Sequence, residues 1–219
     1  MLMDKKAIKD FAVNAREKLR SDVTRKLVKL GITATGVEDV TKIGNDTIEV
    51  PSSGERFTGK DINSRKKLIE VLKNYENQID PKDKKQKEIA FDRLVEEVAY
   101  TWFNRLVAIR FMEVNNYLPG RLRVLSSESG VREPDIITNI LSSDLYVASQ
   151  NRVVELMDDN SAEAVDELYQ LVFIKQCNSL NKQLPDLFEH IDDYTELLFT
   201  VSYIDDNGVI ANLLKIPES

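Results

Sequence analysis

Hydrophobic residues recur every three or four positions over most of the chain, which is the spacing of one face of an α-helix. The first such stripe runs through residues 5–30, and Asp4 and Gly31 are placed to cap its two ends. Its apolar members are Ile8, Phe11, Ala12, Ala15, Leu19, Val23, Leu27 and Leu30. At about 1.5 Å per residue this helix would be nearly 40 Å long. It therefore predicts partners along its whole length.

Residues 31–60 have a different pattern, in which Thr, Gly, Asn and Ser separate short β-branched pieces. The pieces 47–50 and 55–58 flank the turn residues 51–54, which predicts a small β-hairpin or a structured loop. Helical spacing returns near Ser64. The apolar face of this second helix consists of Leu68, Val71, Leu72, Tyr75 and Ile79.

The densest apolar pattern lies between Asp80 and Asn116. Asp80 and Pro81 are typical of a helix start, with an N-cap followed by proline at the first helical position. We expect a helix from there to Asn116, with a break near Lys87, and Pro119-Gly120 as its stop. Its first turns are basic and its later turns are apolar nearly all round, which indicates a central helix packed by several others.

The rest of the chain predicts short elements around one further long helix. Residues 121–125 alternate like a short strand or an extended loop, and a turn follows at 126–130. We expect one or two short helices at 134–148, a long helix at 160–183, and short helices from Pro185 and at 192–200. Asn160 and Glu163 are spaced as a capping pair for the long helix.

Asp206-Asn207-Gly208 fits either a hairpin turn or the entry to a last helix at 209–214, and we favour the helix. The predicted fold class is therefore mainly α, a multi-helix bundle with one small β-hairpin or irregular insertion near residues 45–60. At 219 residues with 42% hydrophobic side chains, the chain is long enough for one domain or two small ones. A subdivision into 1–128 and 129–219 is one expectation.

Composition limits the compartment and the chemistry. No apolar run approaches the roughly 20 residues that cross a bilayer, and the first residues show no secretory signal. The single cysteine, Cys177, excludes an internal disulfide, and with one histidine, His190, no His/Cys set for zinc remains. We expect a cytoplasmic protein without a membrane partner, in which Cys177 is a buried, inert thiol.

Charge is spread unevenly around a formal total of −7. Residues 1–90 contain 20 Lys and Arg against 15 Asp and Glu, whereas residues 131–219 contain 5 against 17. The basic front part is suited to contact phosphate groups. Two ordinary solvated surfaces would explain the same asymmetry.

Several enzyme classes lack their motifs in this sequence. The eight glycines form no G-x-G and no P-loop, and the chain has no Pro-Pro, so the methyl-donor and target-amine motifs of amino-methyltransferases are absent. Asp80-x-Lys82 and Asp83-x-Lys85 resemble half of a metal-dependent nuclease motif, but they lie at a predicted helix start and not on a strand. We expect no catalytic, cofactor-binding or metal-binding residue in this chain.

Three charges, Arg105, Arg110 and Glu113, lie among residues that should be buried. Burying an unpaired charge costs several kcal/mol, so each must meet a partner or an anionic ligand. Arg110 and Glu113 are spaced to pair along the helix, which predicts a structural ion pair that fixes how helices dock.

A nucleic-acid surface is the functional alternative for the arginines, with phosphate contacts that extend from the basic start of the same helix. The candidate residues are Arg105, Arg121, Arg123, Lys84, Lys85 and Lys87. Gly120 would let a ligand approach the backbone closely, and Ser126 and Ser127 are available as hydrogen-bond donors.

The segment Ala99–Glu113, AYTWFNRLVAIRFME, followed by Arg123–Ser127, RVLSS, resembles a known family. Further stretches with the same likeness are Ala7–Arg16, Glu167–Asn178, Pro185–Glu189 and Asp193–Leu198. Together they resemble the N-terminal region of the adenine-specific DNA methyltransferases of BREX phage-defence systems, the PglX type. A helical region before a methyltransferase domain also occurs in restriction–modification methylases.

The resemblance implies a helical N-terminal fragment of a much larger protein, whose S-adenosylmethionine-dependent domain methylates adenine N6. The fragment itself would be non-catalytic, would support the C-terminal methyltransferase domain and would hold double-stranded DNA through phosphate contacts, while the target adenine is flipped out of the stack. S-adenosylmethionine would be the cofactor of the full-length protein only. Other defence-system proteins are expected partners, and the alternative is a protein–protein interaction scaffold without DNA contact.

Overall fold

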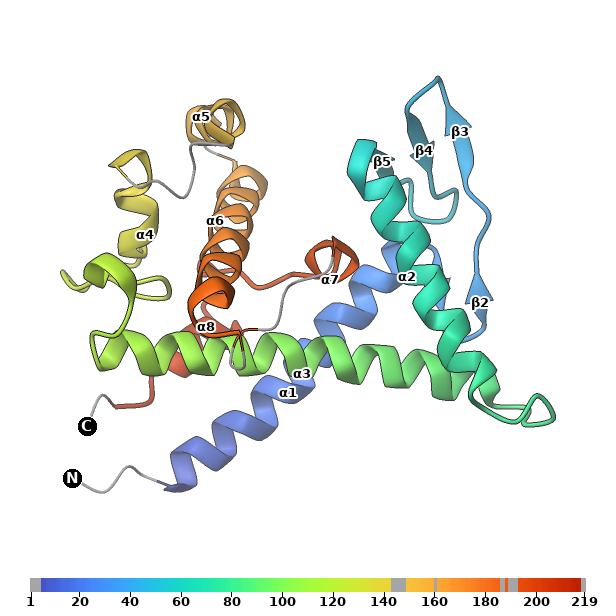
Figure 1. The fold of residues 1–219 in the computed structure, drawn as a ribbon, viewed down its shortest axis with the longest axis horizontal. Coiled ribbons are helices and arrows are strands. Elements are labelled where there is room, and N and C mark those ends of the chain that lie inside the picture. Colours follow the sequence, from blue (N-terminus) through green and yellow to red (C-terminus); the bar gives the residue numbers. More distant parts are fainter. Residues whose placement is uncertain (1–4, 143–148, 160, 186–187, 189–192, 218–219) are drawn as a thin grey trace. The chain divides into compact units, whose positions relative to one another are not determined.

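A computed structural model describes residues 5–142, 149–159, 161–185, 188 and 193–217, and it is mainly helical, as predicted (Figure 1). The helices are α1 (Lys5–Lys29), α2 (Gly59–Asn77), α3 (Gln86–Val114), α4 (Asp135–Thr138), α5 (Gln150–Asp158), α6 (Ala162–Gln183), α7 (Asp193–Leu197) and α8 (Val209–Leu214). Two 3₁₀ turns are η1 (Pro119–Arg121) and η2 (Ile140–Ser142). The strands are β1 (Ile32–Thr33), β2 (Gly36–Val37), β3 (Thr41–Ile43), β4 (Thr47–Glu49) and β5 (Arg56–Thr58).

The chain divides into two compact units, each built from segments that are far apart in sequence. The first unit comprises residues 1–18, 102–191 and 201–219, and the second comprises residues 19–101 and 192–200. The subdivision into 1–128 and 129–219 remains a prediction.

The core of the first unit forms where the later turns of α3 meet α6. The ring centres of Trp102 and Phe173 lie 6.3 Å apart, and those of Tyr169 and Phe173 lie 5.9 Å apart. All three side chains are buried, together with Leu106 and Ile109 of α3. Helices α4 and α5 both contact α6, beside which Figure 1 shows them. The long helix predicted at residues 160–183 is therefore present as α6.

The second unit contains the β insertion. Strands β3, β4 and β5 form an antiparallel sheet in which Ile48 faces Phe57, and both side chains are buried. The hairpin predicted near residues 45–60 is thus confirmed as β4–β5. The third strand and the separate pair β1–β2 were not predicted, because strands of two or three residues are too short to show an alternating pattern.

A glycine and a buried arginine fix the exit of α1 in the second unit. Gly31 has a φ of 70°, as predicted for the residue that ends this helix. The Arg65 guanidinium donates from Nε to the carbonyl of Leu30 (2.8 Å) and from Nη2 to the carbonyl of Glu38 (3.0 Å). A cation on the last carbonyls of a helix is favoured by the helix dipole. Arg65 therefore ties α2 to the end of α1.

The helix start predicted at Asp80 is wrong. Asp80 Oδ1 accepts the backbone N–H of Lys82 (2.9 Å), and Asp83 Oδ1 accepts that of Lys85 (2.8 Å). These local hydrogen bonds hold two successive turns, since short Asp side chains compete with helix formation. The continuous helix α3 begins only at Gln86 and runs without the break expected near Lys87.

Other boundaries also differ from the prediction. The N-cap of α6 is Ser161, whose Oγ accepts the backbone N–H of Ala164 (3.2 Å). Asn160, the first member of the predicted capping pair, lies outside the described residues. Helix α5 was not predicted. Residues 121–125 form no strand, and after η1 the chain follows the other alternative of the prediction, a loop. Helices α7 and α8 agree with the segments expected at 192–200 and 209–214. The Asp4 cap and most of the short helix expected from Pro185 lie outside the described residues.

Two features are absent from the described residues. None of the helices there is both apolar and long enough to cross a membrane. No group of three or more His, Cys, Asp or Glu side chains in that part of the chain is placed to hold a metal ion.

Candidate nucleic-acid interface

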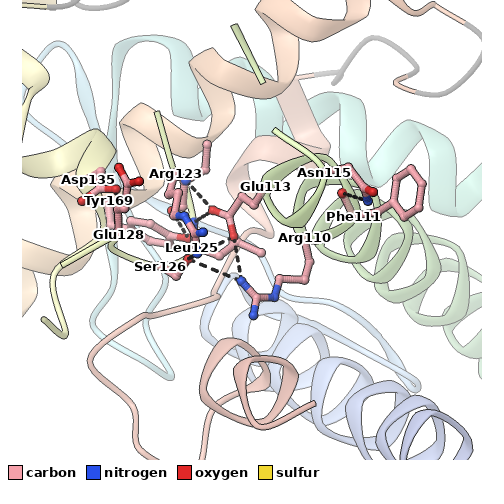
Figure 2. Close-up of polar contacts among 11 residues, drawn as sticks. Arg110, Phe111, Glu113, Asn115, Arg123, Leu125, Ser126, Glu128, Asp135 and Tyr169 are labelled. Atoms are coloured by element: carbon pink, nitrogen blue, oxygen red, sulfur yellow. Dashed lines mark hydrogen bonds and ion pairs between the residues drawn. The ribbon is translucent and has the colours of Figure 1, made fainter. Parts of the chain in front are cut away.

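Glu113, in the last turn of α3, organises the loop of residues 119–128, which we call the 119–128 loop (Figure 2). Its side chain is completely buried. Oε1 accepts the backbone N–H groups of Val124 and Leu125. Oε2 lies 3.3 Å from Arg110 Nη1 and 3.3 Å from Ser126 Oγ. One carboxylate thus ties a helix end to the middle of the loop.

The electrostatics of Glu113 combine opposing effects. Burial raises the pKa of Glu113, because desolvation disfavours its charged form. The two backbone N–H groups and the Arg110 guanidinium oppose that rise in the pKa by stabilising the carboxylate. A buried charge is tolerated when it is paired and its remaining lone pairs are satisfied. The structure joins Arg110 and Glu113 as the i, i+3 spacing predicts.

The other side of the 119–128 loop is fixed by α4 and α6. The backbone N–H of Ile136 donates to the carbonyl of Arg123 (2.9 Å), and Tyr169 Oη donates to the carbonyl of Val124 (3.3 Å). Asp135 accepts from Ser127 Oγ (2.7 Å) and from the backbone N–H of Glu128 (3.0 Å). The loop is therefore anchored on three helices.

The exposed part of this loop carries Gly120 and Arg121. Both have positive φ values, 67° and 56°, in the turn η1. Positive φ is unusual for a residue other than glycine, so the anchored loop holds Arg121 in a conformation that a free chain rarely adopts. Arg123 is half-buried, and its Nη1 lies 3.4 Å from Ser126 Oγ. The loop thus presents Arg121 to solvent and keeps Arg123 partly accessible.

Ser126 and Ser127 have structural partners. Ser126 Oγ lies between the Glu113 carboxylate and the Arg110 guanidinium, and Ser127 Oγ is bonded to Asp135. Both hydroxyls contribute to anchoring the loop.

Arg105 lies inside the first unit. Arg105 is only 4% exposed, and its guanidinium carbon lies 5.1 Å from the centre of the Trp102 ring. Burial raises the pKa of Cys177 to about 12, and the positive charge of Arg105 partly opposes that rise. Arg105 is therefore a core cation stacked on an aromatic ring, in a position that an external phosphate does not reach.

Lys84, Lys85 and Lys87 belong to the second unit, and all three are exposed. Lys85 Nζ lies 3.9 Å from a carboxylate oxygen of Glu88, and Lys87 Nζ lies 3.5 Å from the carbonyl of Thr35 in the β1–β2 turn. These lysines form a basic surface at the beginning of α3. Arg121 and Arg123 form a separate group in the first unit.

The anchoring role of Glu113 could not be read from the sequence. Its spacing from Arg110 signals an ion pair, but Val124 and Leu125 lie beyond the end of the helix, where no periodic pattern connects them to it. Arg65 was missed for the same reason, because its partners are backbone carbonyls 27 and 35 residues earlier.

Comparison with known proteins gives two close sequence matches. The chain is 43% identical to the adenine-specific methyltransferase PglX of Lacticaseibacillus casei (strain Zhang) over 97% of its own length. It is 33% identical to the adenine-specific methyltransferase BrxX of Escherichia coli O9:H4 (strain HS) over 99% of its length. No protein-family model matches the chain.

The matches cover the whole chain but only part of each relative. The chain spans 18% of PglX and 17% of BrxX. Both relatives are named as adenine-specific methyltransferases, which agrees with the family resemblance of the sequence. The resemblance is therefore confirmed: these 219 residues are homologous to a segment of the PglX and BrxX adenine-specific methyltransferases, less than a fifth of their length.

Proposed function

We propose that this chain is the helical, non-catalytic N-terminal part of an S-adenosylmethionine-dependent DNA adenine-N6 methyltransferase of a bacterial phage-defence system. Its role is to support the catalytic domain and to contact the phosphate backbone of double-stranded DNA. The single observation that carries the proposal is the 43% identity to PglX over 97% of the chain.

The residues present indicate which part of the longer protein carries the methyl-transfer chemistry. Methyl transfer to an adenine requires a glycine-rich methyl-donor site and a Pro-Pro motif for the amine, and this sequence contains neither. The cofactor and the flipped adenine therefore belong to the remaining part of the longer protein. The present chain supplies a scaffold.

Phosphate contact is assigned to two basic groups. Arg121 and Arg123 lie on a loop that Glu113 anchors. Because the loop is already ordered, the binding of a phosphate costs little conformational entropy. Lys84, Lys85 and Lys87 supply exposed ammonium groups in the second unit. Arg105 is left out of this surface because it is buried.

The test is the salt dependence of the binding of full-length protein to duplex DNA of random sequence. The slope of log K against log salt concentration is negative, and each phosphate contact adds about 0.9 to its magnitude. Arg121→Ala combined with Arg123→Ala should therefore reduce the magnitude of the slope by about 2. Arg152→Ala is the matched control, because Arg152 is an exposed arginine of the first unit that pairs with Glu155 and Glu167 outside the loop.

An unchanged slope in the double variant would reject phosphate contact by the 119–128 loop. Binding to DNA that is independent of salt, or no binding, would favour the alternative function as a protein–protein interaction scaffold of the defence complex.

A further inference from the structure

The first unit contains an apolar groove that the proposed function does not use. It has a volume of about 370 Å³ and is lined by α1, by the last turns of α3, and by the end of α8 with the residues that follow it. Its main apolar side chains are Phe11, Phe103, Val107, Phe111, Leu213 and Ile216.

Aromatic rings form the groove and remain exposed beside it. The rings of Phe11 and Phe103 stack with their centres 6.1 Å apart. Phe111 is 61% exposed and lies edge-on to Tyr117, which is 63% exposed, with ring centres 6.0 Å apart. Leaving such rings in water forgoes the stabilisation that their burial would provide. Contiguous exposed apolar surface of this kind marks an interaction site.

The groove has the geometry that receives a helix. Phe103, Val107 and Phe111 are spaced four residues apart and share one face of α3. A partner helix placed along them would insert its own apolar residues at positions i, i+3 or i+4, and i+7. The lining contains one charged side chain, Arg110, whose guanidinium is engaged with Glu113. The chemistry of the groove therefore selects an apolar helix face and not a polyanion.

The relatives indicate where such a helix comes from. The chain spans only 17–18% of the matched methyltransferases, so more than four fifths of each polypeptide lies outside the matched region. A segment on the same polypeptide binds in an intramolecular step, which favours it over a separate molecule.

We propose that the groove binds an amphipathic helix from the part of the methyltransferase polypeptide that lies outside these 219 residues. The inference rests on the proposed function and adds to it the surface through which this part supports the rest of the protein. The occupant is a segment of the same molecule, held by its apolar face against Phe103, Val107 and Phe111.

Photocrosslinking of the full-length protein tests the inference. Phe111→p-benzoylphenylalanine places a reactive ketone at the groove, and Tyr100→p-benzoylphenylalanine is the matched control. Tyr100 lies on the same helix and is equally exposed, at 64%, but it does not line the groove. After irradiation, peptides are mapped by mass spectrometry.

The expected result is a crosslink from position 111 to a helical segment outside residues 1–219 of the same molecule, absent from the control. A crosslink to a second copy of the protein would overturn the inference in favour of self-association. Absence of any crosslink from position 111, with the protein folded, would overturn it as well.

The crosslink is independent of chemistry on DNA, so the two proposals fail separately. If the full-length protein crosslinks within one molecule but transfers no methyl group to adenine, the proposed function fails and the docking surface stands. If it methylates adenine without the crosslink, the docking surface fails alone.

Discussion

The carboxylate of Glu113 accepts the backbone N–H of Leu125, twelve residues further along the chain. Glu113 Oε1 also accepts the backbone N–H of Val124, and Glu113 Oε2 pairs with Arg110. Together these contacts anchor the 119–128 loop to the end of α3. Because that loop carries Arg121 and Arg123, a buried structural group determines how two candidate DNA contacts are presented.

Removal of the Glu113 side chain should destabilise the first unit. Glu113→Ala leaves two buried N–H groups without their acceptor and removes the ion pair with Arg110, and breaking such a buried pair costs about 3–5 kcal/mol. Glu128→Ala, an exposed change in the same loop, should stay within about 0.5 kcal/mol. The measurement is the free energy of unfolding in urea, and equal effects of the two substitutions would contradict the anchoring role.

Stability should depend on pH through Glu113. Its native pKa is raised by burial above the ordinary value of 4.5, so the native state binds the proton more tightly than the unfolded state. The resulting penalty is fully present above the native pKa and disappears as pH falls through it towards 4.5.

The wild-type protein should therefore gain free energy of unfolding relative to Glu113→Gln as the pH is lowered from neutral into this window. The comparison isolates one group, since glutamine does not titrate. A difference that stays constant over the same pH range would show that the pKa of Glu113 is not raised.

Gly31 should tolerate alanine less well than Gly54. Both residues have a φ near 70°, which costs an alanine about 1–2 kcal/mol. A Cβ at Gly31 would also lie 2.9 Å from Val50 Cγ1, whereas no atom lies within 4 Å of one at Gly54. Gly31→Ala should therefore lower the melting temperature more than Gly54→Ala, and equal shifts would mean that Val50 moves aside without cost.

Cys177 should react with iodoacetamide only when the chain opens. The side chain is 1% exposed, and burial raises the pKa of its thiol to about 12, so the reactive thiolate is scarce at neutral pH. Alkylation followed by mass spectrometry should be slow under native conditions and rapid in urea. Native-state reaction at the rate of a small-molecule thiol would contradict the buried position.

The sequence predicts elements where one periodic face is buried, as for α6, whose stripe includes Leu168, Tyr169 and Phe173. It fails where a local or distant polar contact decides the structure. Asp80 is placed in the sequence like a helix N-cap, yet its carboxylate accepts the backbone N–H of Lys82 and holds a turn there. Phe111 belongs to an apolar pattern that predicts burial on all sides, but it is exposed at the groove.

The candidate site shows the same limit. The i, i+3 spacing of Arg110 and Glu113 is sufficient to predict their contact. The apolar pattern also places Arg105 among residues that should be buried, but it does not decide whether that arginine meets a group of the protein, as it meets Trp102, or an external phosphate. Solvent access of an arginine depends on which segments pack over it, and those segments are distant in sequence.

We propose above all that these residues form a scaffold whose methyl-transfer chemistry lies elsewhere in a longer polypeptide. The measurement that tests this proposal is the transfer of a labelled methyl group from S-adenosylmethionine to duplex DNA, by the full-length protein and by residues 1–219 alone. We expect N6-methyladenine with the full-length protein and no transfer with the shorter chain. Transfer by residues 1–219 alone, or a full-length protein that methylates no adenine, would contradict it.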